Sequence, residues 1–454
     1  MQEAARGASG LTAISVIAAA AGLALGAAWA FSPLTILLGG AILWMCAHCV
    51  AGLAGRERTH VARILSIAVG ARAIVIGLLL LATRPEQEPF FALFPDSRYM
   101  LDRSLWIRNI WLGVTIGPHQ SLGIFDPYAA SSYPFVLAAL QMLAGPSPYA
   151  LCLLSVCALT AGALLFHRMI RETFGGPAAT VALGSIVLWP TLFAWSVSVL
   201  RESFQFQLGA VVAAALYYFV RCSSWRARAA WAALLVAALA ILSTLRSGTV
   251  EIALVAVALA LAFRAVAARP SLALALVVVS AFAFWRAEDR IVPMIRLAAD
   301  RHIGHVMSAG RSYRLLDEQY YAAGTPSLAG MTAGDSIEYL ARSAGAFLAE
   351  PKPWRAGSLS EIAMIPQQAA WYGALAAALI GVAIGLRRDA WLTSILAAYP
   401  VAGLIIIGPN SGNIGTLVRH RDMIVPFVLA LAAVGLMALA SRATEPERDQ
   451  EAAA

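Results

Sequence analysis

Basic side chains stand directly before the last apolar segment of this 454-residue sequence. The stretch from Gly408 to Met423 reads GPNSGNIGTLVRHRDM and contains Arg419, His420 and Arg421. Its glycines and asparagines favour tight turns, so we expect a loop here. A guanidinium can bind phosphate through two parallel, charge-assisted hydrogen bonds. The stretch therefore predicts a phosphate-binding loop, with a simple anchor at a helix end as the competing interpretation.

Two more arginines stand at borders of apolar segments, Arg201 in LRESF and Arg246 in TLRSGT. With the orientation argued below, both lie on the outer side of a membrane. Arginine there runs against the usual distribution of positive charge, so a group of them indicates an anion site. A snorkelling arginine paired with its neighbour, here Arg201 with Glu202, is the competing interpretation. The predicted phosphate ligands are Arg201, Arg246, Arg419, His420 and Arg421.

An aspartate in the first long polar stretch is the candidate for acid–base chemistry. Asp96 lies in FPDSRY, and Asp102 and Asp126 follow in the same stretch. An ionised carboxylate can take a proton from a hydroxyl group within hydrogen-bond reach. We expect Asp96 to be this general base. Asp102 and Asp126 are rivals, and a helix cap or a surface charge would also explain any of the three.

Arg72 stands in the middle of an apolar segment, in VGARAIVIG. A charge at that depth costs about 3 kcal/mol on insertion scales, so the side chain should face other helices or a wet cavity. It either pairs with a carboxylate of another helix or lines an active cavity, and the sequence favours neither. The histidines form no close metal-binding constellation, so no metal site is predicted.

Apolar helices must position these side chains. Hydrophobic residues make up 60% of the sequence, charged residues make up 13%, and the mean hydropathy is +0.74. Continuous apolar runs of roughly 20 residues, the length that crosses a bilayer, recur along the chain. They predict an all-α polytopic membrane protein with about 12 transmembrane helices, the first over Leu11–Ala30. The apolar stretch Pro134–Leu143 is too short to cross and predicts an interfacial or re-entrant helix.

The distribution of arginine predicts the orientation. With the N-terminus in the cytoplasm, most arginines fall in inner loops, as the positive-inside rule requires. Two long polar segments then lie outside: a loop over residues 83–147, and residues 286–370, whose mixed charges and paired tyrosines favour a small folded cap. The predicted location is the inner (plasma) membrane of a bacterium, with both termini cytoplasmic and the active site extracytoplasmic.

These segments divide the chain along its length, and no tandem repeat of fixed period is visible. The boundaries follow the apolar runs and the polar segments between them. The predicted parts are an N-terminal transmembrane hairpin (1–61), a transmembrane core with the outer loop (62–250), further transmembrane helices (251–285), the cap (286–370), C-terminal transmembrane helices with the RHR loop (371–441) and a cytoplasmic tail (442–454).

Three features occur together: the acidic outer loop, the short SYPFVLAALQMLAGPSPYAL stretch, and LLFHRMIRETFGGPAATVALGSIVLWPTLFAW after it. This layout resembles the integral-membrane glycosyltransferases of the GT-C superfamily, over residues 62–246 best. The similarity is to bacterial relatives of the dolichyl-phosphate-mannose protein mannosyltransferases and to the lipid A aminoarabinose transferases. The chain departs from them in lacking their large C-terminal soluble domain and a second acidic residue directly beside Asp96.

The resemblance implies a polyprenyl-phosphate sugar donor, transfer of a hexosyl or pentosyl group with inversion at the anomeric carbon, and Asp96 as the base. The acceptor would be a glycan, a lipid or a protein. Membrane lipids would surround the protein, and no binding of nucleic acid is predicted. The arginines would hold the donor phosphate and stabilise its charge as the sugar departs. No cofactor is predicted, although a divalent cation stays an open alternative. The substrate site would be lined by Tyr99, Asp102, Arg72 and Glu202.

Other functions compete with this one. An O-antigen-type polymerase or ligase would make Arg419, His420 and Arg421 central and Asp96 incidental. A transporter or flippase for lipid-linked sugars would show internal repeats and interrupted helices in its two halves, and the sequence shows no such symmetry. A structural subunit of an envelope complex would leave the outer arginines and the Asp-bearing loop without an explanation.

Overall fold

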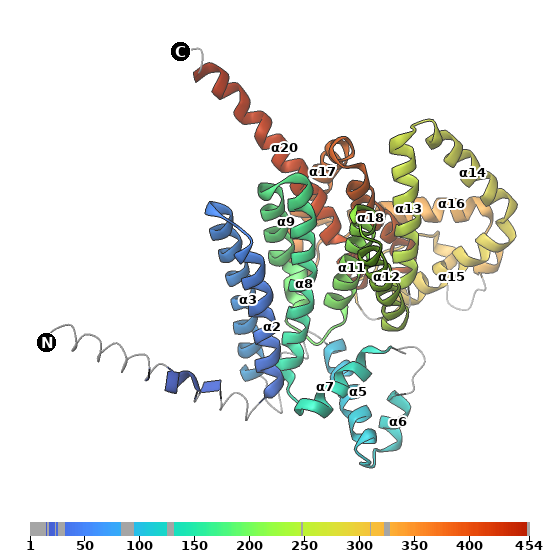
Figure 1. Ribbon diagram of the computed structural model, residues 1–454. Helices are drawn as coiled ribbons and strands as arrows, with labels where there is room; N and C mark the ends of the chain where they lie inside the picture. The colour runs from blue at the N-terminus through green and yellow to red at the C-terminus, as the bar shows by residue number, and fades with distance from the viewer. Residues whose placement is uncertain are drawn as a thin grey trace. The chain divides into compact units, whose positions relative to one another are not determined.

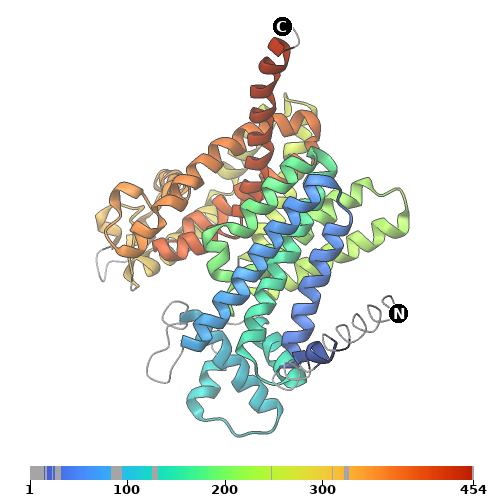
Figure 2. The ribbon, with the colours of Figure 1, turned by 90° about the vertical axis from the view of Figure 1, so that its left-hand side faces the viewer.

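The structure is a computed structural model, and it describes residues 15, 18–22, 24–25, 32–82, 95–124, 131–246, 248–308, 310–321 and 327–451. Both ribbon views show helices and no strands in this part of the chain (Figure 1, Figure 2). An isolated antiparallel bridge pairs Ser312 with Asn413. The all-α fold class is therefore confirmed for the described residues. The chain divides into two compact units, which are taken one at a time.

Unit 1 comprises residues 1–54, 65–160 and 195–201. Its first described long helix begins at a proline, which suits the first turn because a proline has no N–H to leave unpaired. The Ser32 side chain caps this helix by accepting a hydrogen bond from the Thr35 amide at 3.3 Å. The helices that lie wholly or partly in unit 1 are α2 (Pro33–Ala51), α3 (Gly55–Ala82), α5 (Pro95–Trp111), α6 (Pro118–Ile124), α7 (Tyr133–Ala144), α8 (Pro148–Phe174) and α10 (Pro190–Ser196).

Unit 2 comprises residues 55–64, 161–194 and 202–454. It contains the second part of α8, the beginnings of α3 and α10, and all later helices. Its further helices are α9 (Gly176–Leu188), α11 (Glu202–Arg221), α12 (Trp225–Leu245), α13 (Thr249–Ala268), α14 (Leu272–Arg286), α15 (Glu288–Met307), α16 (Ala333–Ala349), α17 (Leu359–Arg388), α18 (Ala390–Asn410), α19 (Ile414–Arg421) and α20 (Val425–Glu451), with short 3-10 turns η2 (Glu318–Tyr321), η3 (Ser327–Gly330) and η4 (Pro353–Arg355).

The described residues hold 8 helices that are long and apolar enough to cross a membrane. The number rises to 10 if two bent pairs each form one span: α9 with α10, bent by 57°, and α19 with α20, bent by 60°. The chain is thus an all-helical polytopic membrane protein. The predicted count of about 12 included Leu11–Ala30, which lies largely outside the described residues, and the stretch that forms α14, a shorter helix of 15 residues.

The predicted outer loop over residues 83–147 is largely helical where the structure describes it. It contains α5, α6 and α7, of which the sequence predicted only the last. A buried side-chain contact holds two of these helices together. Gln141 on α7 donates a hydrogen bond to Ser104 on α5 at 2.7 Å, and both residues are buried. The short helix predicted over Pro134–Leu143 is confirmed as α7, which has 12 residues.

The second polar segment, residues 286–370, is folded around a hydrophobic cluster of its own. This cluster joins α15, α16 and the chain between them. The helix α17 begins within this segment and runs without a break to Arg388, so no structural boundary falls at the predicted position 370. The buried members of the cluster are Ile295, Ala299, Leu315, Leu316, Tyr321, Met331 and Tyr339.

Close backbone contact joins α17 and α20 in unit 2. A methyl group at Gly381 would lie 1.9 Å from the carbonyl oxygen of Leu431, and one at Gly435 would lie 2.1 Å from that of Ala377. Only glycine fits at both positions. Small residues that let helix backbones approach each other are typical of packing between membrane helices.

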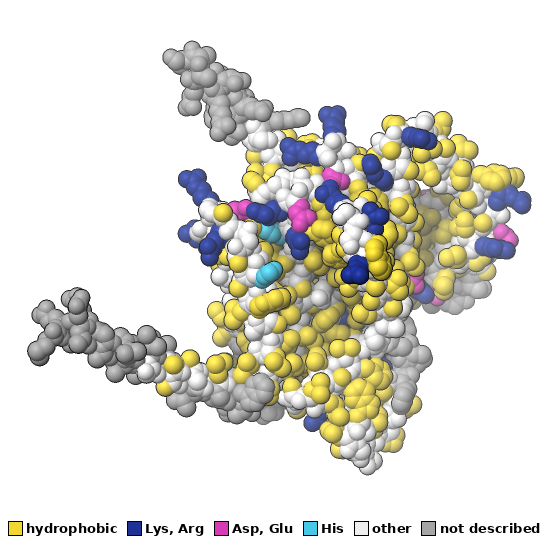
Figure 3. Space-filling view, viewed as in Figure 1, with side chains coloured by type: hydrophobic (Ala, Val, Ile, Leu, Met, Phe, Trp, Pro, Cys, Tyr) yellow, Lys and Arg dark blue, Asp and Glu magenta, His cyan; other side chains and the backbone are white. Residues whose placement is uncertain are grey.

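Exposed arginines gather at one end of the helices of unit 2. Figure 3 shows the dark blue side chains of this group over the start of α3 and the end of α8. The two segments are joined by Arg171, whose Nε atom donates to Glu57 at 2.7 Å. The structure thus brings together two of the arginine-rich segments that the sequence assigns to inner loops. The exposed members are Arg56, Arg58, Arg63, Arg168 and Arg171.

Candidate functional site

Glu202 is a buried carboxylate at the start of α11, with 4% of its surface exposed. Its Oε1 atom accepts a hydrogen bond from Arg419 Nε, and Arg246 Nη1 lies 3.5 Å from the same oxygen. Arg246 also donates a hydrogen bond to His420 Nε2. A buried carboxylate needs such partners because an isolated charge away from water is very costly. We call Glu202, Arg246, Arg419 and His420 the Glu202 cluster.

Two of the four residues of the Glu202 cluster are arginines. Two guanidinium groups share one carboxylate, and the arginine side chains of Arg246 and Arg419 stay 18% and 17% exposed. The imidazole of His420 lies beside these guanidinium groups through its contact with Arg246. Guanidinium groups suit a phosphate oxygen, because they donate charge-assisted hydrogen bonds.

The position of Arg246 is fixed by the turn between α12 and α13. The Thr249 hydroxyl lies 2.8 Å from the carbonyl oxygen of Leu242 and 2.8 Å from that of Arg246. Gly248 begins α13 with a φ of 90°, a backbone conformation that other residues rarely adopt. The turn therefore holds the end of α12 in place, with Arg246 next to Glu202.

A short helix, α19, positions Arg419 and His420. The Asn413 side chain caps it by accepting hydrogen bonds from the amides of Gly415 at 2.9 Å and Thr416 at 3.3 Å. The prediction of a loop from Gly408 to Met423 was therefore wrong, because Asn413 caps a helix here. The basic side chains lie in the last turn of α19, where the carbonyl ends of the helix favour cations.

Arg421 is not a member of the Glu202 cluster. It is 2% exposed and donates to the carbonyl oxygens of Phe347 at 3.2 Å and Glu350 at 2.6 Å. It also donates to Gln368 at 3.0 Å and lies 4.7 Å from the ring centroid of Trp371. These contacts use the guanidinium to hold the end of α16 against α17, so Arg421 acts as a structural residue here rather than with the predicted phosphate ligands.

Asp422 fixes the bend between α19 and α20, which sequence reasoning missed. Its Oδ1 atom accepts a hydrogen bond from the Thr191 hydroxyl at 2.8 Å, and this hydroxyl accepts one from Gln367 Nε2 at 3.0 Å. Asp422 is 2% exposed. A polar residue next to the RHR sequence and before an apolar run is the signal that could have indicated this buried network.

The predicted base, Asp96, lies in unit 1, exposed in the first turn of α5. The next residue, Ser97, is fully buried and accepts a hydrogen bond from the Val199 amide at 3.0 Å. The start of α5 therefore touches the segment that ends with Arg201, another predicted site residue of the same unit. Asp126, the second rival, lies outside the described residues.

The predicted lining residues Tyr99 and Asp102 lie further along α5. The Tyr99 hydroxyl accepts a hydrogen bond from Arg103 Nη1 at 2.9 Å. Asp102 pairs with Arg98 one turn earlier, at 3.6 Å between Nε and Oδ2. On a helix, Tyr99 shares a face with Asp96, whereas Asp102 does not.

Arg72 is buried within unit 1, as its depth in an apolar segment requires. Its Nε atom donates to the Ser196 hydroxyl at 2.6 Å, and its Nη1 atom donates to the Ala68 carbonyl oxygen at 2.9 Å. These bonds tie α3 to the end of α10. The side chain faces other helices, as its depth predicted. Its two predicted roles, pairing with a carboxylate of another helix and lining an active cavity, stay predictions.

The structure thus brings together Glu202, Arg246, Arg419 and His420 in unit 2, whereas Asp96, Tyr99, Asp102, Arg72 and Arg201 belong to unit 1. Among the described residues, no three histidine, cysteine, aspartate or glutamate side chains are grouped as metal ligands would be. Fold and site define the class, a polytopic helical membrane protein with a cationic cluster at the end of its helices. Comparisons with protein-family models, curated proteins and solved structures found no match for this chain.

Proposed function

We propose that the chain is a membrane glycosyltransferase and that the Glu202 cluster binds the phosphate of a polyprenyl-phosphate sugar donor. The observation that supports this most directly is the pairing of Arg246 and Arg419 around a single buried carboxylate. Such a donor has its tail in the bilayer and its phosphate at the boundary. Arginines at the ends of apolar helices support this proposal, because such a phosphate would need cationic partners at the boundary.

In the proposed reaction, a base takes the proton from an acceptor hydroxyl group, and the base predicted from the sequence is Asp96. The oxygen then attacks the anomeric carbon, forming the new glycosidic bond while the bond from that carbon to the phosphate oxygen breaks. The electron pair of the broken bond stays on the polyprenyl phosphate. Arg246 and Arg419 would stabilise this added charge, and Glu202 would hold both guanidinium groups in position before the donor arrives.

The proposal is tested by sugar transfer with purified protein in nanodiscs. The donors are radiolabelled polyprenyl-phosphate sugars, and the acceptor is a crude envelope fraction. Loss of one arginine that stabilises the departing phosphate should slow transfer by about 100-fold or more in Arg419→Gln. Asp96→Asn should slow it by a similar or larger factor, because it removes the base.

Arg168→Gln is the matched control, since Arg168 is exposed and pairs with Glu172 on its own helix. It should transfer sugar like the unmodified protein. Normal rates in both Arg419→Gln and Asp96→Asn would contradict the proposal. Correct folding of each variant is checked by its elution in size-exclusion chromatography.

A second candidate is an O-antigen-type polymerase or ligase, which also joins polyprenyl-linked glycans. The bond between Arg246 and His420 favours it, because this function makes the arginine and histidine residues central. The same assay separates the two. Consumption of diphosphate-linked oligosaccharides, with no consumption of monophosphate-linked sugars and no effect of Asp96→Asn, would identify the polymerase or ligase.

A further inference from the structure

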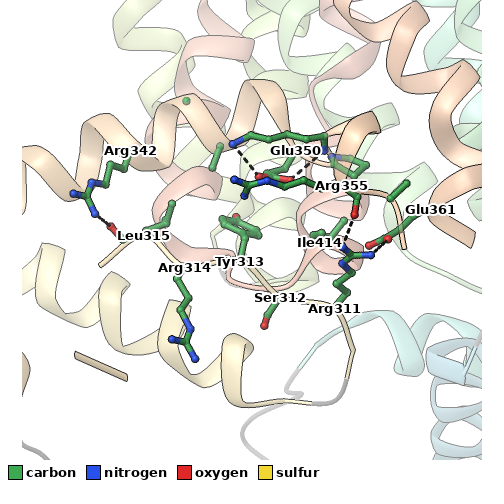
Figure 4. Close-up of a pocket in the computed structure, with 15 residues that line it drawn as sticks. Arg311, Ser312, Tyr313, Arg314, Leu315, Arg342, Glu350, Arg355, Glu361 and Ile414 are labelled. Atoms are coloured by element: carbon green, nitrogen blue, oxygen red, sulfur yellow. Dashed lines mark hydrogen bonds and ion pairs between the residues drawn. The ribbon is translucent and has the colours of Figure 1, made fainter. Parts of the chain in front are cut away.

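A cavity of about 530 Å³ lies in unit 2 (Figure 4). Its lining residues belong to the predicted cap and to the stretch Gly408–Met423, and sequence reasoning gave none of them a role of its own. Its walls come from the chain after α15, the end of α16, the 3-10 turn η4, the first turn of α17 and the start of α19. The lining includes Arg311, Tyr313, Glu350, Lys352, Arg355 and Ile414.

Cationic side chains outnumber carboxylates in this lining. There are five of the former and two of the latter. An enclosed surface with this balance attracts anions, because low-dielectric walls concentrate the field of like charges. The cations are Arg311, Arg314, Arg342, Lys352 and Arg355, and the carboxylates are Glu350 and Glu361.

Both carboxylates of the lining already have cationic partners. Arg311 Nη1 donates to Glu361, and the Lys352 Nζ atom lies 3.5 Å from Glu350 Oε1. These pairs balance each other's charge and fix the geometry of the wall. The other three cations of the lining have no carboxylate partner within the lining.

Two of those three cations are paired with residues outside the lining. Arg314 pairs with Glu318, and Arg342 pairs with Glu338, in each case one turn away. Among the described residues, no carboxylate pairs with the guanidinium of Arg355. Figure 4 shows the Arg355 side chain extending over the cavity above Tyr313, whereas Arg314 points away below. Arg355 is the cation best placed to meet a ligand.

The floor of the cavity is held by backbone bonds between two distant segments. The Ile414 amide donates to the Arg311 carbonyl oxygen at 3.0 Å, and the Tyr313 amide donates to that of Gly412 at 3.1 Å. The Tyr313 hydroxyl donates to the Ser411 carbonyl oxygen. The aromatic ring of Tyr313 is thereby fixed in the cavity, and a fixed aromatic ring is a surface on which a sugar ring can stack.

The opposite wall is also fixed. Arg421 donates to the Glu350 carbonyl oxygen at 2.6 Å, immediately before the segment that contains Lys352 and Arg355. A ligand would thus meet a cavity with an anchored aromatic ring and anchored walls. Preorganised groups of this kind lose little entropy on binding.

The cavity is close to the Glu202 cluster along the chain. Ile414 lines the cavity and begins α19, and Arg419 lies five residues later on the same helix. A helix rises 1.5 Å per residue, so the two positions are roughly 8 Å apart along its axis.

We propose that this cavity binds an anionic saccharide, a sugar unit that bears a carboxylate or phosphate group, with its ring on Tyr313 and its charge on Arg355. The proposal rests on the proposed function in one respect: if the chain is a glycosyltransferase, the saccharide bound in this cavity is its acceptor. An acidic glycan is thereby named as the acceptor class. Binding itself does not require transfer to occur.

Isothermal titration calorimetry on the full chain in nanodiscs of neutral lipid tests the proposal. The probes are digalacturonic acid, galactose 1-phosphate, inorganic phosphate and neutral galactobiose. A charge-assisted hydrogen bond should make at least one of the two anionic sugars bind about tenfold or more tightly than galactobiose. Inorganic phosphate should bind more weakly than the preferred anionic sugar, because it lacks a ring.

Two variants show whether the cavity is responsible. Arg355→Gln should weaken binding of the preferred sugar by about tenfold. Arg290→Gln makes the same change of charge at an exposed residue of α15 outside the lining, and it should bind normally. Tyr313→Leu, which removes the aromatic face, should weaken both anionic and neutral sugars.

Several results would overturn the inference. Equal affinity for digalacturonic acid, galactose 1-phosphate and galactobiose would remove the role of charge, and unchanged affinity in Arg355→Gln would remove the role of the cavity. Inorganic phosphate that binds as tightly as the preferred sugar would leave a bare anion site. Loss of binding in nanodiscs with anionic lipid would assign the cavity to lipid headgroups.

The two proposals can fail separately. Binding of the anionic sugar without any transfer would refute the glycosyltransferase proposal and leave the saccharide site standing. Transfer without a preference for anionic sugars would refute the saccharide site and leave the glycosyltransferase proposal standing.

Discussion

Glu202 illustrates how single residues set the chemistry of this protein. Its partner Arg419 is 217 residues away in the sequence, and both are brought together at the ends of different helices. The sequence suggested Glu202 only as a lining residue and as a local partner for Arg201. The structure makes it the shared acceptor of two guanidinium groups, so removing its charge should release both arginines from their fixed positions.

His302 gives a prediction about pH. It is fully buried, its Nδ1 atom lies 3.2 Å from the Ser411 carbonyl oxygen, and its Nε2 atom lies 2.9 Å from the Tyr321 hydroxyl. Burial lowers the pKa of His302 to about 4, opposed by the bond to Ser411 and assisted by His305. The unfolded chain therefore binds the proton more tightly than the folded chain, and stability present above the unfolded pKa of about 6.5 is lost as the pH falls toward 4.

The expected loss is up to about 3 kcal/mol between pH 6.5 and pH 4. Thermal unfolding in detergent, followed by intrinsic fluorescence at pH 7.5 and pH 4.5, measures it. His302→Gln should lower the unfolding temperature at pH 7.5 and should flatten its fall at low pH. His305→Gln, on the same helix, is the control. Its unfolding temperature should fall between pH 7.5 and pH 4.5 by more than that of His302→Gln. A fall of the same size in His302→Gln as in the unmodified protein would show that another group is responsible.

Residue spacing explains why only part of the site could be predicted. The sequence grouped Arg246, Arg419 and His420 as phosphate ligands, and the structure brings these three together, while their role stays a prediction. Arg421 was grouped with them because a loop was expected. On a helix, side chains two positions apart point in nearly opposite directions, so α19 sends Arg419 and Arg421 to different neighbours.

The pairing of α17 with α20 shows how one element depends on another. The stretch GVAIG, with Gly381 and Gly385 four residues apart, is typical of closely packed membrane helices and could have indicated this contact from the sequence. The partner helix could not be identified that way. The partner helix contributes Gly435, which lies close to the Ala377 carbonyl oxygen. Gly435 is 54 residues after Gly381 in the sequence, so no local pattern links the two.

Gly381→Ala should destabilise the protein by about 1–3 kcal/mol or more, because the new methyl group would overlap the Leu431 carbonyl oxygen and force α20 away. Thermal unfolding in detergent measures the change. Gly373→Ala is the matched control on the same helix, since a methyl group there meets nothing within 4 Å. It should leave stability unchanged or raise it slightly, as alanine favours helix over glycine. Equal behaviour of the two variants would contradict the close contact.

At the scale of the whole molecule, hydrophobicity alone was enough to predict the class. Long apolar runs have few alternatives to a membrane-spanning helix, because every backbone polar group must be satisfied within the hydrocarbon. The polar segments were harder. Within residues 83–147 the sequence predicted α7 but neither α5 nor α6, because burial of Gln141 against Ser104 depends on contacts that a linear pattern does not contain.

The orientation of the chain in the membrane can be tested on one helix. The 30 residues of α17 extend about 45 Å, more than the roughly 30 Å of a hydrocarbon core, so its two ends can reach opposite sides. The positive-inside rule predicts that Leu359 lies outside and Arg388 lies in the cytoplasm. Both residues are exposed, which suits them for labelling.

In a variant without its five native cysteines, Leu359→Cys should react with a membrane-impermeant maleimide on intact spheroplasts. Arg388→Cys should react only after the membrane is permeabilised. The two sites serve as controls for each other, because they share one helix and one variant background. Labelling of position 388 alone in intact spheroplasts would reverse the topology. It would put the cavity that contains Arg355 in the cytoplasm, where the proposed extracytoplasmic acceptor would not reach it.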